Sequence, residues 1–198
     1  MALNTKLLIP IAAVIVVLGI IAAFVLPGMM GTAPQEEEKV FIVVAYHWGF
    51  ALYDEDYNPI DQIVVNQGDK VKIYFFNARS FAPEFHTQLE EKELETGIGG
   101  LTGEELKAKI DEAISTGQID HGLQITAFKV FMSTNYKNFS GKAKSISEFF
   151  QIEDKEAIEQ QAVTFVADKP GTYDFVCYIV CGYGHTFMVY QDALKVVG

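Results

Sequence analysis

The sequence is poor in basic residues. Its 15 lysines and arginines stand against 26 aspartates and glutamates, which gives a net charge of −11. Such a surface disfavours binding to nucleic acid or to anionic lipid headgroups. The chain also has only two cysteines, so a zinc site that needs a second cysteine pair is excluded. Its 198 residues are too few for a large multidomain enzyme and suit one domain plus an additional segment.

The additional segment is an uncharged apolar run from Leu7 to Leu26. At about 1.5 Å per residue, a helix of that length reaches roughly 30 Å and can cross the hydrocarbon core of a membrane once. A cleaved secretory signal is the alternative, but the apolar core of such a peptide is shorter, at roughly 7–15 residues. Lys6 precedes the run and acidic residues follow it, which predicts that the rest of the chain lies outside the cytoplasm. We expect a single-pass cell-membrane anchor in contact with lipid over residues 1–27, a linker over 28–39 and an extracytoplasmic domain over 40–198.

The predicted domain is mainly β. Runs of β-branched and aromatic residues separated by Gly, Pro and Asn turns predict strands at 40–45, 63–65, 71–76, 163–165, 173–177 and 188–197. No regular alternation of strands and helices occurs between them. The pattern therefore predicts an antiparallel β-sandwich or barrel.

Two segments between the strands predict helices. Thr102 is followed three residues later by Glu105, which is typical of a capping box, and apolar residues then recur on one helical face up to Gly117. A second, weaker helical pattern starts at Ser145. We expect insertions near residues 79–118 and 129–161.

Residues 177–188 contain two thiols, an imidazole and a thioether: Cys177, Cys181, His185 and Met188. These are soft or borderline ligands, and thiolate with thioether favours copper. Gly182 and Gly184 allow so short a loop to bring the side chains together. A structural disulfide between the cysteines is the main alternative, because the domain is predicted to face an oxidising compartment. Structural zinc is a weaker one, since methionine adds nothing to a zinc site.

The spacing Cys-x3-Cys-x3-His-x2-Met before the last strand resembles the CuA motif of cytochrome oxidase subunit II. The resemblance implies a cupredoxin-like domain in which Cys177 and Cys181 bridge two copper ions. It further implies that His185 and Met188 are ligands and that Ile179 contributes its carbonyl oxygen. The single predicted span is more similar to the B-type oxidases than to the mitochondrial type. Ile179 stands where the family often has glutamate, so a metal at the subunit interface is not implied.

The family takes its other histidine ligand from an earlier strand. His121, within Asp120-His121-Gly122, resembles the family pattern, and the following residues alternate as a strand should. His86 is the competing candidate because it lies nearer the preceding predicted strand, but a polar stretch follows it. We favour His121. If His86 were the ligand, the insertion would lie after the ligand strand.

The resemblance also implies a role and partners. The chain would be the electron-entry subunit of a haem–copper terminal oxidase, taking electrons from a cytochrome c or small copper protein and passing them to haem in subunit I. Oxygen reduction would belong to that partner subunit. Trp48 lies in an aromatic run resembling one in the family, which implies electron entry there; a core aromatic is the alternative. A membrane-tethered copper carrier or assembly factor would use the same soft ligands and remains the competing function.

Overall fold

The computed structural model describes residues 38–198, and these residues form two five-stranded sheets. The predicted anchor and nearly all of the predicted linker lie outside the described residues. Within residues 38–198, none of the helices combines the length and hydropathy that crossing a bilayer requires.

The first sheet has the strand order β3-β2-β1-β5-β8. In that order its strands are Pro59–Ile60, Gly49–Tyr53, Lys39–Tyr46, Lys70–Asn77 and Ala162–Val166. The second sheet has the order β4-β10-β9-β6-β7, with strands Ile63–Asn66, Val189–Val197, Gly171–Val176, Gly122–Ile125 and Val130–Ser133. The mainly β class is confirmed. Six of the eight strand pairings in the described residues are antiparallel, as expected, but β1 pairs with β5, and β4 with β10, in parallel.

The apolar core lies between the two sheets. The inward faces of β1, β2 and β5 contribute side chains such as Phe50 and Phe75, and β6 and β9 contribute Leu123 and Phe175; all four are at most 3% exposed. The metal-binding candidates Cys177, Cys181 and Met188 belong to the same cluster. The candidate site is therefore built into one end of the core, where close packing restricts the movement of side chains.

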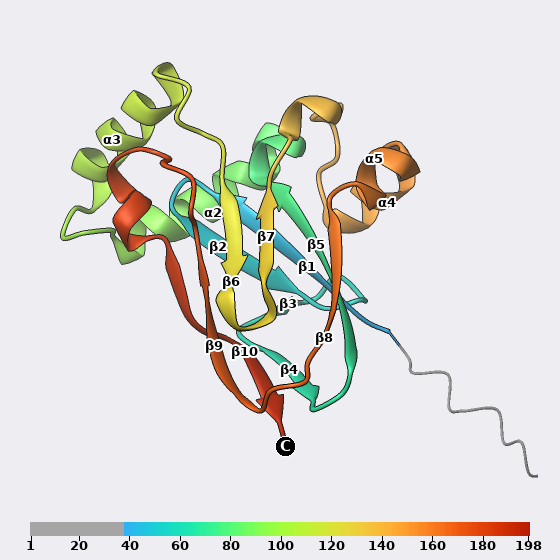
Figure 1. The fold of residues 1–198 in the computed structure, drawn as a ribbon. Coiled ribbons are helices and arrows are strands. Elements are labelled where there is room, and N and C mark those ends of the chain that lie inside the picture. Colours follow the sequence, from blue (N-terminus) through green and yellow to red (C-terminus); the bar gives the residue numbers. More distant parts are fainter. Residues whose placement is uncertain (1–37) are drawn as a thin grey trace, which may run out of the picture. The chain divides into compact units, whose positions relative to one another are not determined.

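The helices lie in the segments that join strands (Figure 1). After β5 come α2 (Pro83–Thr96) and α3 (Gly103–Ser115), and after β7 come α4 (Ile146–Ile152) and α5 (Lys155–Glu159). A helix was predicted in each of these two segments. In the first segment the prediction covered α3 but not α2, and in the second segment the single predicted helix is divided into α4 and α5. The capping box at Thr102 was wrong in detail, because Thr102 takes the N-cap position without a side-chain hydrogen bond. Ser145 does cap α4, by accepting from the Glu148 N–H.

A second apolar cluster covers the outer face of the first sheet. Phe76 of β5 contacts Phe149 of α4 with ring centroids 4.7 Å apart, and Phe81, which follows β5, stacks on Phe149 at 4.5 Å. Phe85 of α2 joins the cluster through Phe81, at 4.4 Å. The helices after β5 and β7 are thus attached to the sheet by buried aromatic rings, each of which typically stabilises a fold by a few kcal/mol.

Candidate metal centre

Residues 177–188, termed here the metal loop, connect β9 to β10 and include a 3-10 helix over Tyr183–Phe187. The two ends of the loop are joined by a hydrogen bond of 3.1 Å from the Cys177 N–H to the Met188 carbonyl. Gly182 has a φ of 93°, a conformation that L side chains rarely adopt. Gly184 lies against the Trp48 ring, where an added Cβ would be 2.1 Å from ring atoms. The two glycines therefore permit the turn and the close packing that the loop requires.

The loop brings together the soft donors that its sequence contains. The Sγ atoms of Cys177 and Cys181 lie 3.8 Å apart, and Cys181 Sγ lies 3.8 Å from Met188 Sδ. His185 Nδ1 is 3.9 Å from Cys181 Sγ, and the Ile179 carbonyl oxygen is 3.2 Å from Cys177 Sγ. All five residues predicted from this loop thus converge around the two sulfur atoms.

The sulfur separation distinguishes a metal site from a disulfide. Both cysteines are free thiols, and their distance of 3.8 Å is far longer than the roughly 2.05 Å of an S–S bond. A metal–thiolate bond is about 2.3 Å long, so two sulfurs that share one ion lie at most about 4.6 Å apart. The observed separation satisfies this limit.

His121 completes the cluster from another strand. It directly precedes β6, and its ligand atom lies within 4.8 Å of those of Cys177 and Cys181. Its backbone is held to Thr134, whose N–H donates to the His121 carbonyl at 3.0 Å. The side chain is 2% exposed, yet Nδ1 has no hydrogen-bond partner. A buried imidazole nitrogen without a partner, beside two thiols, fits a metal ligand.

His86 lies elsewhere. It is on α2, where its Nε2 is 3.2 Å from the Phe81 carbonyl oxygen, and it is not part of the His121, Cys177 and Cys181 group. The structure therefore places His121 beside the two cysteines and His86 in a different contact.

Proton sharing between the thiols shifts both pKa values. Hydrogen bonding from Cys181 lowers the pKa of Cys177 to about 3, and His121 and the Gly122 N–H act in the same direction against the opposing effect of burial. The pKa of Cys181 is raised because it holds the proton shared with Cys177, and burial adds to the effect. The lowered pKa of Cys177 favours the thiolate that metal binding requires, and binding a metal through both sulfurs also releases the proton of Cys181.

Trp48, in the turn between β1 and β2, packs against the metal loop. Its Nε1–H donates to the Cys181 carbonyl at 2.5 Å, and its ring is 1% exposed. It is thus buried in this domain and does not itself form a surface contact. The nearest exposed ring is Tyr183, whose centroid lies 5.8 Å from that of Trp48 and which is 38% exposed.

A carboxylate that the sequence did not point to supports Trp48. Glu93 of α2 is 3% exposed and accepts a hydrogen bond from the Trp48 backbone N–H at 3.1 Å. Its other oxygen is 3.0 Å from His47 Nδ1. Glu93 lies among four other acidic residues in the segment 84–95, and no local pattern distinguishes it from the exposed ones. Its role arises only when α2 packs against the end of β1.

No protein-family model matches this sequence, and no curated protein is significantly similar to it. Among solved structures, the periplasmic domain of subunit II of cytochrome oxidase from Bradyrhizobium japonicum is 12% identical, with a TM-score of 0.42 over 84% of this chain and 88% of that one. A chain from the structure of a mixed disulfide between thioredoxin-like TlpAs and subunit II of cytochrome c oxidase is 12% identical. Its TM-score is 0.40 over 85% of this chain and 87% of that one. A chain of a haem–copper terminal oxidase dimer is 13% identical, with a TM-score of 0.37 over 98% of this chain and 99% of that one. At these identities and TM-scores, we base the function on the residues of the site.

Proposed function

We propose that this chain is the electron-entry subunit of a haem–copper terminal oxidase and that its cupredoxin-like domain holds a dinuclear CuA centre. The observation that carries the proposal is the convergence of six donors at one end of the core. Two cysteine sulfurs form the middle of the group, with His121 and the Ile179 carbonyl beside Cys177. His185 and Met188 lie beside Cys181.

The donor set suits two copper ions better than one. A mononuclear blue-copper site uses two histidines, one cysteine and a weak axial ligand such as methionine. The present cluster has a second cysteine and a carbonyl oxygen in addition. Zinc is a poorer fit, because the thioether of Met188 is a soft ligand and is buried in the cluster.

Bound copper would supply a one-electron redox couple. The chain's own contribution is to hold the ligands in fixed positions and to exclude water from the sulfur ligands. Cys177, Cys181 and Met188 are at most 3% exposed, and the loop is closed by hydrogen bonds to its own backbone and to Trp48. Because little can move around the donors, the ligand geometry should change little on gain or loss of an electron, which favours fast transfer.

The membrane anchor is proposed from the apolar run, and the electron donor and the partner subunit are proposed from the resemblance to subunit II. Residues 1–27 would anchor the chain in the cell membrane by a single span, and the domain would lie outside the cytoplasm. The electron would come from an external donor, a cytochrome c or a small copper protein, and pass to haem in subunit I. The donors in the described residues form an electron-transfer site, and the oxygen chemistry would take place in the partner subunit.

Co-purification tests the assignment. Mild detergent extraction of the native membrane, with capture through an affinity tag at the C-terminus of this chain, should recover a larger haem-bearing subunit in equal amount. Haem absorption and the copper content of the same sample measure both partners together. Recovery of this chain alone, with no haem protein in stoichiometric amount, would contradict the oxidase assignment.

A further inference from the structure

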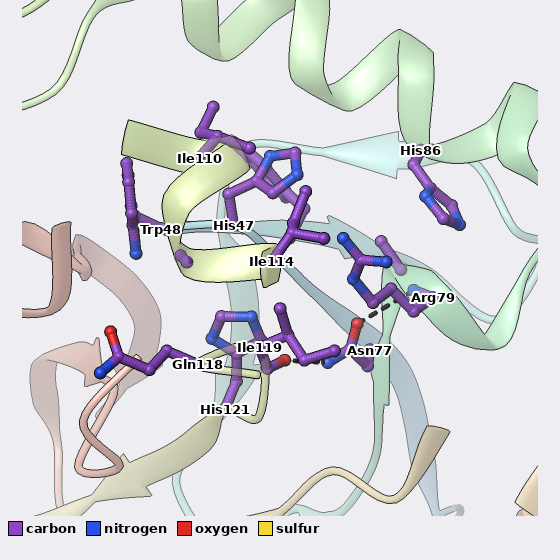
Figure 2. Close-up of a pocket in the computed structure, with 13 residues that line it drawn as sticks. His47, Trp48, Asn77, Arg79, His86, Ile110, Ile114, Gln118, Ile119 and His121 are labelled. Carbon is purple, nitrogen blue, oxygen red and sulfur yellow. Dashed lines mark hydrogen bonds between the residues drawn. The ribbon is translucent and has the colours of Figure 1, made fainter. Parts of the chain in front are cut away.

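A small cavity lies beside the metal centre, between the end of β1, the segment after β5 and helix α3 (Figure 2). Three of the four histidines of the chain line it, namely His47, His86 and His121, together with Arg79. Arg79 is the only arginine in the sequence. No aspartate or glutamate lines the cavity, although the whole chain has 26 acidic and 15 basic residues. Positive charge and hydrogen-bond donors are thus concentrated at one place in an acidic protein.

Arg79 lacks an anionic partner in the part of the chain that the structure describes. None of the ion pairs among residues 38–198 includes its guanidinium group. Two acidic residues of the neighbouring helix α2 are engaged elsewhere: Glu93 binds His47 and the Trp48 N–H, and Glu90 is 3.1 Å from Lys107 Nζ. Half-buried arginine is usually paired with a carboxylate or phosphate, since it retains its charge at any ordinary pH.

The position of Arg79 is fixed by a buried side chain. Asn77 is 2% exposed, and its Oδ1 accepts a hydrogen bond from the Arg79 backbone N–H at 2.9 Å. Its Nδ2 donates to the Ile119 carbonyl at 2.7 Å and so joins the segment after β5 to the residue two positions before His121. Figure 2 shows these two bonds on one side of the cavity. The cavity wall is therefore a built arrangement in which both polar ends of Asn77 are used.

His121 supplies a second hydrogen-bond donor at the cavity, the N–H of its imidazole ring, which needs a hydrogen-bond acceptor. A histidine that binds a metal through one ring nitrogen carries a proton on the other, and that N–H is normally donated to an oxygen or a water. Within residues 38–198, no hydrogen bond joins the His121 ring to an oxygen atom. The cavity lies against this ring, so a ligand in the cavity would have to accept hydrogen bonds rather than donate them.

The cavity volume limits the ligand to a small group. The volume is about 20 Å³, and roughly 10–15 Å³ is required for one water molecule. Apolar side chains such as Ile110 and Ile114 form much of the remaining wall. We propose that this cavity is a binding site for a small monovalent anion, chloride or a single carboxylate group, held by the Arg79 guanidinium next to His121.

Chloride and formate are the probes for a direct test, carried out on the metal-free full chain in detergent. Binding is measured by the excess line width of the chlorine NMR signal and by its loss as sodium formate is added at constant ionic strength. Removing a hydrogen bond to a charged group weakens binding by about ten-fold or more, which is the loss expected for Arg79→Gln. Arg79→Lys keeps the positive charge but lacks the planar guanidinium group with its paired N–H donors. Its affinity for chloride should therefore lie between those of the wild type and Arg79→Gln.

Lys195→Gln is the matched control, because it removes one positive charge from an exposed position on β10. It should bind chloride as the wild type does. Chloride should also raise the melting temperature of the wild type and of Lys195→Gln, but not that of Arg79→Gln, because a ligand stabilises only the state that binds it. Absence of excess line width in the wild type would show that the cavity does not bind chloride. Equal line widths in Arg79→Gln and the wild type would show that chloride binds without Arg79. Either result would overturn the proposal. Because no copper is present, the experiment tests the contact with Arg79 alone, and its result does not depend on the proposed electron-transfer function.

Discussion

The metal loop lies next to the segment 79–118, which was predicted to be an insertion and is called the insertion here, but the two sequences carry different kinds of information. The loop holds four side-chain donors within twelve residues, so its chemistry can be read from a single short stretch. The inserted segment holds no donor of the cluster, yet its Glu93 supports Trp48, and Trp48 in turn bonds to the Cys181 carbonyl. Most of the proposed ligands are thus local in sequence, whereas His121 and the contacts that position the loop come from distant segments.

The largest effect is expected from removing a shared sulfur in the metal loop. Cys177→Ser or Cys181→Ser should abolish the dinuclear centre, because a hydroxyl oxygen is a harder ligand than a thiolate and cannot bridge two copper ions in its place. Copper content and the visible absorption spectrum of the full chain measure this loss. Val180→Ala is the control, since Val180 lies in the same loop and is 70% exposed. A serine variant that kept two coppers and the wild-type spectrum would disprove the role of both sulfurs.

The next largest effect is expected at His121, which lies outside both regions, and it is compared with the effect of changing His86, which lies inside the insertion. His121→Ala should lose or restructure the copper site, because it removes the proposed ligand that directly precedes β6. His86→Ala should keep the optical and EPR spectra, because His86 lies on α2 and contacts the Phe81 carbonyl instead. The opposite outcome for the pair would mean that the ligand lies in the insertion and that the placement of His121 is wrong.

A milder change is expected from Met188→Leu in the metal loop. Methionine is a weak, neutral ligand, and leucine has a similar volume, so copper should stay bound and the core should remain packed. The reduction potential should shift, and redox titration of the full chain followed by absorbance measures it. Complete loss of copper would show that Met188 Sδ matters as much as the thiolates.

The smallest effect on the metal is expected from the insertion itself. Glu93→Gln removes the charge that faces His47 and weakens the bond to the Trp48 N–H, so the unfolding free energy should fall by about 1–3 kcal/mol. The copper content should not change, because Glu93 is not a ligand. Chemical denaturation of the full chain measures the difference, and Glu91→Gln, at an exposed position of α2, is the matched control. Equal stability of the two variants would remove the supporting role assigned to the insertion.

The same comparison explains what could be predicted from sequence. The strands near residues 40–45 and 71–76 were found because their apolar residues form continuous runs, but nothing in a run shows that β1 and β5 pair in parallel. Helix α3 was found because its apolar residues share one face, whereas α2 was missed because charged residues dilute Phe85, Leu89 and Leu94. The resemblance to the subunit II motif pointed to the loop donors and to His121, which the structure places close together, and their role as ligands stays a prediction. The roles of Glu93 and Arg79 depend on tertiary packing and leave no local signal.

The central claim is that the six donors hold two copper ions that share one electron. Copper analysis together with an EPR spectrum of the purified, copper-loaded full chain tests it most directly. The proposal predicts two coppers per chain and, in the oxidised form, one unpaired electron whose hyperfine pattern shows equal interaction with both copper nuclei. One copper per chain, or Cu(I) that exchanges readily with added chelator, would contradict the claim and favour a membrane-tethered copper carrier.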